Sequence, residues 1–154
     1  MKGVRTASTK GDLSLLDDLT VTEAHSYEGK YFAQQLLSRQ VFMFRDSIKE
    51  VFDLHMPDLV YKNFCLIDSE DKKTHMYYHA PALKVVSVMS EKSYRDFYNN
   101  LTLYLDKDKI YELDGLDAFR LSEPENIIVV SLPVAESLMR RKIPGILLTH
   151  IEMV

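Results

Sequence analysis

The pattern of apolar and polar positions is most informative in the last part of the chain, where it predicts strand, helix and strand. Residues 127–130 form a continuous β-branched run, which is typical of a buried strand. Ser131 follows with a hydroxyl able to cap a helix, and Pro133 suits a first helical turn because its missing N–H costs nothing there. The basic residues 140–142 complement the negative end of the helix dipole. Pro144-Gly145 then ends the predicted helix, and residues 146–153 are expected to be extended.

Earlier in the chain, the pattern predicts a strand followed by a helix. Residues 40–44 favour a strand, and Asp46 or Ser47 can cap the next element. That element is predicted to be a helix because apolar side chains recur at i, i+3 and i+4: Ile48, Val51 and Phe52. Pro57 is expected to end it.

A β-hairpin is predicted next. Residues 59–68 are apolar on both alternating faces, residues 69–73 are a polar turn, and residues 74–79 return as an aromatic-rich strand. Pro81 is expected to break this second strand. A further strand is expected in the apolar, β-branched residues 83–89.

The remaining segments give shorter elements. Residues 90–100 are predicted to form a short helix capped by Ser90, because Tyr94, Phe97 and Tyr98 fall at helical intervals. We expect residues 101–105 to be extended and residues 118–121 to form a strand. Residues 13–21 suit either a short helix or an extended segment, residues 28–39 are expected to be helical in part, and residues 1–12 are a loose polar tail.

Strands followed by short helices, without regular βαβ alternation, predict an α+β fold with a mixed, mainly antiparallel sheet. We expect one domain over residues 13–154, because 154 residues of which 46% are hydrophobic can bury a real core. A net charge of -4 argues against nucleic acid and anionic membranes as partners. A single cysteine, a start without the apolar core of a signal peptide and no apolar run of ~20 residues favour a cytoplasmic location.

Few residues offer catalytic or metal chemistry. His75 and His79 would stand ~13 Å apart along a strand, too far to share one metal, so we interpret them as packing across the hairpin. Cys65 has no evident activating neighbour and is read as a small buried hydrophobe. Glu136 and Ser137 are adjacent on a helix, which does not bring them together, and are assigned to solvent or packing. No glycine-rich phosphate loop is present, so no cofactor is expected.

Acidic residues concentrate before the last strand and helix. The simpler interpretation is that they keep turns solvated. The sharper hypothesis is an acidic surface for a basic partner, because complementary fields speed association. The candidate contact residues are Asp106, Asp108, Glu112, Asp114, Asp117, Glu123 and Glu125.

The end of the chain carries four short motifs, Phe119-Arg120-Leu121, Ile127 to Ser131, Ala135-Glu136-Ser137-Leu138 and Pro144-Gly145-Ile146. Their order is a strand with Phe-Arg, an apolar strand, a helix and a Gly-Ile turn into a last strand. This order resembles the closing pattern of the immunity protein 11 family of bacterial polymorphic-toxin systems. The Tyr77-Tyr78 strand and residues 85–89 are similar to the middle of the pattern, so the resemblance covers roughly residues 41–154 and leaves the first forty unmatched.

The resemblance implies a cytoplasmic, non-enzymatic protein that binds a cognate toxin and neutralises it by occluding its active surface. The toxin would be encoded next to it, and no catalytic residue or metal site carries over. Arg140 and Arg141 match a basic helix end in the family, which dipole complementarity also explains. Two other classes stay open: a small-molecule enzyme that uses Cys65 or the His75/His79 face, and a structural protein-interaction module with an exposed apolar patch or a symmetric dimer surface.

Overall fold

The computed structural model describes residues 17–24, 35–37, 42–70, 72–124 and 127–154. These residues form an α+β fold in which most strand pairs are antiparallel, as the sequence predicts. The predicted tail, residues 1–12, lies outside them, as does most of the segment 28–39. The strands of the largest sheet are β1 (Leu19–Ala24), β2 (Gln35–Leu37), β3 (Phe42–Phe44), β4 (Tyr61–Asp68) and β5 (His75–Pro81).

The five-stranded sheet has the order β1-β4-β5-β3-β2. Its centre is the predicted hairpin: β4 and β5 pair antiparallel from Tyr61↔Pro81 to Ile67↔His75. Pro81 is predicted to break the strand, and β5 ends at this residue, although one more backbone hydrogen bond, 2.9 Å from the Ala82 N–H to the Val60 carbonyl, follows it. The open choice at residues 13–21 resolves as extended from Leu19 onward, since β1 pairs parallel with β4. The predicted helical content of residues 28–39 is wrong at Gln35–Leu37, which pair with β3.

Helix α2 (Asp46–His55) confirms the predicted apolar stripe. Ile48, Val51 and Phe52 are buried, and they pack against Phe44 of β3. The predicted cap is wrong, because Arg45 takes the N-cap position without a side-chain hydrogen bond and Asp46 is already helical. The helix ends at His55, two residues before Pro57.

A smaller sheet, in the order β11-β10-β6, connects two hydrophobic clusters. Its strands are β6 (Val85–Val86), β10 (Ala118–Leu121) and β11 (Ile128–Val130), so the strand predicted over residues 83–89 is shorter than expected. Ala118 faces the first cluster, which contains the buried residues of α2 and α4, whereas Phe119 and Leu121 face the second, with Val88 and Leu105. Both faces of the sheet are therefore apolar, which explains the β-branched run of β11.

Helix α4 (Leu132–Arg140) begins as predicted, with Pro133 in its first turn. Its buried residues Val134 and Leu138 pack in the same cluster as α2. Residues 146–153 are predicted to be extended, but regular strand pairing in this stretch is limited to β12 (Glu152–Met153), which lies parallel to β9 (Tyr104–Leu105).

The helix predicted over residues 90–100 is wrong. This segment is a β-hairpin in which β7 (Tyr94–Arg95) pairs antiparallel with β8 (Leu101–Thr102). It is followed by a short helix that the apolar spacing does not predict, α3 (Lys107–Tyr111). None of the helices in the described ranges is long and apolar enough to span a bilayer.

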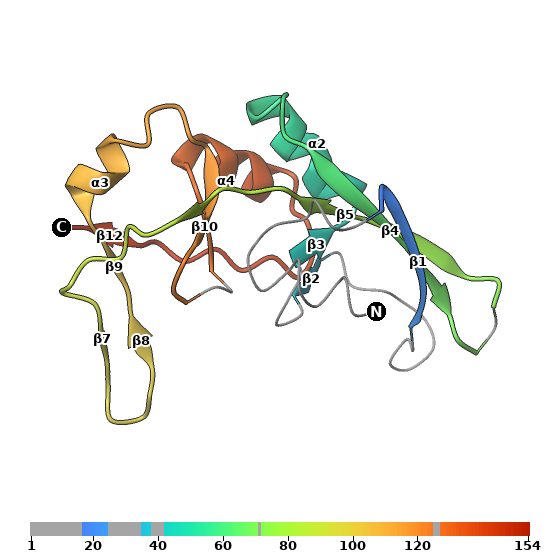
Figure 1. Cartoon of the computed structure of the whole chain (residues 1–154), viewed down its shortest axis with the longest axis horizontal. Helices are drawn as coiled ribbons and strands as arrows, with labels where there is room; N and C mark the ends of the chain where they lie inside the picture. The colour runs from blue at the N-terminus through green and yellow to red at the C-terminus, as the bar shows by residue number, and fades with distance from the viewer. Residues whose placement is uncertain (1–16, 25–34, 38–41, 71, 125–126) are drawn as a thin grey trace.

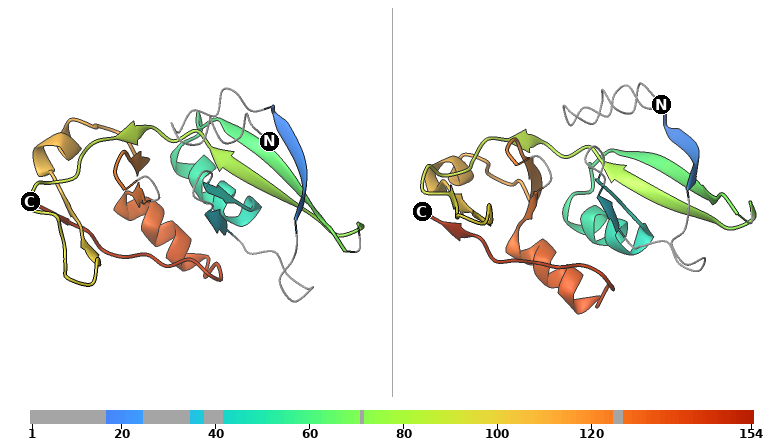
Figure 2. Two further views of the ribbon diagram at one scale, coloured as in Figure 1. Left: turned by 60° about the horizontal axis from the view of Figure 1, so that its bottom comes forward. Right: turned by 90° about the horizontal axis from the view of Figure 1, so that it is seen from below.

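The molecule is elongated (Figure 1). The five-stranded sheet lies at one end, α2 and α4 lie between, and α3, β9 and β12 lie at the other end (Figure 1). The β7–β8 hairpin leaves the body at this second end, and the turned views show it and α3 at the same end (Figure 2).

Candidate functional site

The structure divides the predicted acidic surface into structural and exposed members. Asp106 is the N-cap of α3, because its carboxylate accepts hydrogen bonds from the backbone N–H groups of Asp108, at 3.1 Å, and Lys109, at 3.2 Å. The backbone hydrogen bond from Lys109 lowers the pKa of Asp106 most, and together with the Lys109 side chain it outweighs the opposing effect of burial. Asp106 therefore stabilises its own helix.

Asp117 also has a structural contact. Its carboxylate accepts a hydrogen bond of 2.6 Å from the hydroxyl of Ser131, and its backbone carbonyl accepts one of 2.8 Å from the Ser131 N–H. Ser131 occupies the N-cap position of α4 as predicted, but its hydroxyl bonds to Asp117 instead of to the helix. The two residues join the start of β10 to the end of β11.

The other acidic candidates that the structure describes are exposed. Asp108, Glu112 and Asp114 lie in α3 and the turn after it, where Lys107 and Lys109 alternate with them. Glu123 is exposed beyond the end of β10, and Glu125 lies outside the described residues. The structure thus brings three of the predicted residues together around α3 and leaves Glu123 apart.

The tip of the β7–β8 hairpin, at the same end of the molecule as α3 but pointing away from it (Figure 1), exposes two large aromatic side chains. Phe97 is 96% exposed and Tyr98 is 81% exposed. Their rings make an edge-to-face contact with centroids 5.6 Å apart. Neither residue is among the candidates predicted from the sequence, because their helical spacing with Tyr94 predicts the apolar stripe of a helix. The pattern Asp96, Asn99, Asn100 is a turn signal that would have identified the tip.

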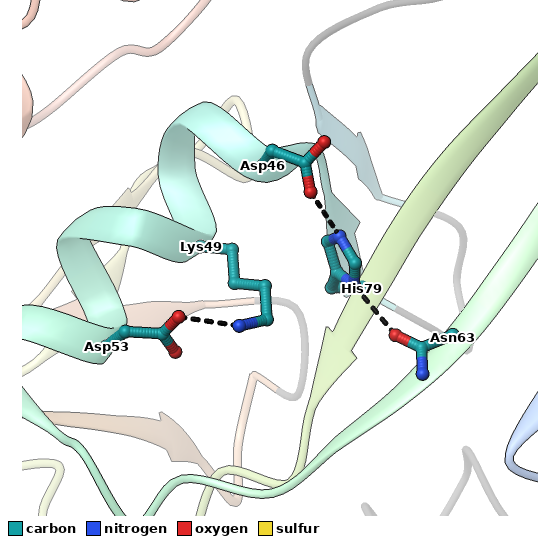
Figure 3. A network of polar contacts seen from close by, with 5 residues as sticks. All are labelled: Asp46, Lys49, Asp53, Asn63 and His79. Atoms are coloured by element: carbon teal, nitrogen blue, oxygen red, sulfur yellow. Dashed lines mark hydrogen bonds and ion pairs between the residues drawn. The ribbon is translucent and has the colours of Figure 1, made fainter.

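A polar network joins the start of α2 to the sheet (Figure 3). Nε2 of His79 lies 2.7 Å from Oδ1 of Asp46, and Nδ1 lies 2.7 Å from Oδ1 of Asn63. A protonated ring can donate to both oxygens, and a neutral ring fits if the Asn63 amide turns over so that its NH2 group donates to Nδ1. His79, on β5, thus links the start of helix α2 to the neighbouring strand β4.

A second pair of the same network lies on α2 (Figure 3). Lys49 donates a hydrogen bond of 2.5 Å to Asp53, and its ammonium group lies 4.6 Å from the ring centroid of Tyr61. Burial would raise the pKa of Asp53, but the hydrogen bond and charge of Lys49, with Tyr61 nearby, lower it below the ordinary value. Burial, together with the neighbouring Asp53 carboxylate, raises the pKa of Tyr61.

The histidines, the cysteine and the serine singled out from the sequence have separate surroundings. His79 contacts Tyr61 of β4 edge-on at 6.2 Å, which agrees with the predicted packing across the hairpin, whereas the edge-on contact of His75, at 5.8 Å, is with Tyr77 of its own strand. Cys65 is buried, as predicted. Ser137 was assigned to solvent or packing, but its hydroxyl lies 2.9 Å from Nε2 of His55 on α2.

Glu136 pairs with Arg140 on the same helix at 3.4 Å. In the part of the chain that the structure describes, no group of three or more His, Cys, Asp or Glu side chains could hold a metal ion. Comparison with known proteins finds no family model that matches the chain and no curated protein that matches it.

Proposed function

We propose that this chain is a non-enzymatic immunity protein of a bacterial polymorphic-toxin system, which binds a cognate toxin domain and neutralises it by covering the active surface. The observation that carries the proposal is the order of elements at the end of the chain. Phe119-Arg120-Leu121 lies in β10, the next apolar run in β11 and Ala135 to Leu138 in α4, and Gly145 follows in a turn with φ 81°. This is the order of the family pattern that the sequence resembles.

The end of the molecule that carries α3 and the β7–β8 hairpin supplies the contact surface. Exposed carboxylates around α3 would attract a basic toxin surface, since complementary charge speeds association. The exposed aromatic tip adds apolar contact area at the same end of the molecule. A binding function needs such a surface and no reacting groups.

The test uses the product of the open reading frame next to the gene for this chain. Expressed alone, that product should stop bacterial growth, and co-expression with this chain should restore it. The two purified proteins should also form a stable complex in isothermal titration calorimetry. Growth arrest that persists during co-expression, with no binding heat between the purified proteins, would contradict the proposal.

One contact favours an enzyme as a second candidate. The 2.9 Å distance between Ser137 Oγ and His55 Nε2 is that of a nucleophile and its general base. Such a pair usually needs a third group that orients the base, and no carboxylate contact to His55 is present among the described residues. A fluorophosphonate probe that labels Ser137, and fails to label Ser137→Ala, would favour this candidate over the immunity function.

A further inference from the structure

The β7–β8 hairpin presents its aromatic side chains outside the body of the protein. The hairpin projects away from the rest of the chain (Figure 1), and Phe97 and Tyr98 stand at its tip, 96% and 81% exposed. Tyr94, on the first strand, is also more exposed than buried. Adjacent exposed aromatic rings are unusual on a protein surface, because their transfer out of water is favourable.

The tip is held in one conformation by its own hydrogen bonds. The Asp96 carboxylate accepts bonds from the N–H of Tyr98 at 2.9 Å, the N–H of Asn100 at 2.8 Å and the Asn100 amide at 2.9 Å. Asn99 takes a left-handed conformation with φ 65°, and its carbonyl accepts a bond of 3.0 Å from Arg95. The rings are therefore displayed on a preorganised turn, so little conformational entropy is lost when they bind.

The base of the hairpin is also anchored. The Ser93 hydroxyl donates to the carbonyl of Tyr104 at 3.0 Å and accepts from the N–H of Tyr104 at 2.9 Å. Tyr104 belongs to β9, which leads directly into α3. The aromatic tip and the exposed carboxylates of α3 thus belong to one continuous segment, residues 93–114.

The charges of the hairpin distinguish between kinds of partner. From Ser93 to Thr102 the only charged residues are Arg95 and Asp96, which cancel. Binding to nucleic acid or to an anionic membrane requires an excess of Lys and Arg beside the aromatic rings, which the hairpin lacks. Around α3, at the same end of the molecule, the exposed carboxylates of Asp108, Glu112 and Asp114 stand against the exposed ammonium groups of Lys107 and Lys109, so the excess charge there is negative. A protein that offers an apolar pocket to the neutral hairpin, and a basic patch to the α3 end, has the complementary chemistry.

We infer that Phe97 and Tyr98 are the anchors by which this chain binds its toxin, inserted together into an apolar pocket of the toxin, while the carboxylates of α3, at the same end of the molecule, face a separate basic part of the toxin surface. This inference rests on the proposed immunity function and deepens it by naming the binding element. Aromatic side chains at the centre of an interface commonly carry most of the binding free energy.

The experiment measures the dissociation constant between the purified neighbouring gene product and three versions of this chain. These are the wild type, the double variant Phe97→Ala/Tyr98→Ala and the matched control Leu147→Ala, which removes an apolar side chain that is 87% exposed elsewhere. We expect the double variant to bind at least tenfold more weakly and the control to bind like the wild type. Circular dichroism melting should be the same for all three, because the altered side chains contribute little buried surface.

The possible outcomes separate the two proposals. If the wild type binds and the double variant binds less than tenfold more weakly, the hairpin is not the anchor, while the immunity function stands. If the wild type itself does not bind or protect, the immunity function fails and this inference fails with it. A double variant that melts differently is replaced by Phe97→Ser, judged by the same tenfold criterion.

The same proteins are tested against two other probes, phosphatidylserine vesicles and single-stranded DNA. We expect no binding to either by the wild type at physiological salt. Binding to one of them that is lost in Phe97→Ala/Tyr98→Ala would overturn the assignment of a protein partner to this hairpin.

Discussion

At the scale of single residues, polar side chains join elements that are distant in the sequence. Ser137 contacts His55 across the α4 and α2 helices, Ser131 contacts Asp117 between two strands, and His79 contacts Asp46 at the start of α2. Each contact fixes the relative position of two elements that apolar packing alone would leave free to slide.

The Ser131 contact gives a stability prediction. Ser131→Ala removes the 2.6 Å hydrogen bond to the Asp117 carboxylate, which is half-buried and would lose its side-chain donor. We expect the free energy of unfolding to fall by about 1.5–3 kcal/mol, as is usual for a hydrogen bond to a charged group. Urea unfolding measures this loss. The control Ser131→Thr keeps the hydroxyl, so an equal loss in both variants would show that the hydrogen bond is not the cause.

Tyr61 gives a prediction at alkaline pH. Its hydroxyl is buried without a well-formed hydrogen bond among the described residues, so Tyr61→Phe should leave the free energy of unfolding at pH 7 unchanged or raise it by up to about 1 kcal/mol. The pKa of Tyr61 is raised above its ordinary value of 10.0 in the folded state, chiefly by burial. As pH rises past 10, the unfolded chain therefore ionises first, and folding stability falls.

In Tyr61→Phe, the part of the stability loss above pH 10 that comes from the ionisation of Tyr61 should disappear. The free energy of unfolding from urea titrations at pH 8, 9.5 and 10.5 measures it. Some loss should remain, since burial also raises the pKa of Tyr78. Tyr77→Phe, at an exposed position, is the control and should follow the wild type. An alkaline loss of the same size in Tyr61→Phe and wild type would contradict the prediction.

At the scale of elements, the β7–β8 hairpin depends on one carboxylate. Hydrogen bonds from the Asn100 side chain and backbone are the main causes that lower the pKa of Asp96 below its ordinary value of 3.8, against a small opposing effect of burial. The folded turn therefore favours the ionised carboxylate. Its contribution is complete above the ordinary aspartate pKa and is lost as pH falls through the lower, folded pKa.

We expect the hairpin to keep its order from pH 7 down to about pH 4 and to lose it below that range. The amide proton shifts of Tyr98 and Asn100, followed by NMR during acid titration, should move together with the Asp96 carboxyl. In Asp96→Asn the two amide shifts should not titrate with this group. Amide shifts that move unchanged in Asp96→Asn would show that another group orders the turn.

This hairpin also shows what the sequence could not predict. Tyr94, Phe97 and Tyr98 repeat the i, i+3, i+4 spacing of a helix, but the Asp96 hydrogen bonds and the left-handed Asn99 stabilise a turn instead. Local side-chain bonds of this kind compete with the helix and leave no trace in apolar periodicity. The β10–β11–α4 segment was predictable because its β-branched run, Pro133 and Gly145 all act locally.

The candidate contact surface was predictable only in part. The sequence shows that acidic residues concentrate around α3. It does not show which of them are exposed and which form hydrogen bonds within the fold. Asp106 and Asp117 accept hydrogen bonds within the fold, and the donor to Asp117, Ser131, lies 14 residues away in the sequence. The exposure of Phe97 follows from the direction of the hairpin, which depends on how β7 and β8 join the body.

At the scale of the whole molecule, β10 connects the two hydrophobic clusters. Ala118 packs in the cluster with α2 and α4, and the next residue, Phe119, packs in the cluster with β9. Phe44 extends the first cluster into the five-stranded sheet. Because neighbouring residues of one strand serve both clusters, loss of either cluster should displace β10 and weaken the other.

The single cysteine allows this coupling to be measured. Cys65 is buried in β4 of the five-stranded sheet, so a thiol reagent labels it only after the sheet opens.

Leu121→Ala leaves a cavity in the distant second cluster and should lower the free energy of unfolding by about 3 kcal/mol. If the chain unfolds as one cooperative unit, labelling of Cys65 should accelerate on the order of a hundredfold, the factor that corresponds to this loss. Leu147→Ala, at an exposed position, should leave the labelling rate unchanged. A Leu121→Ala protein that unfolds more easily by circular dichroism while Cys65 is labelled at the wild-type rate would show that the two halves unfold separately.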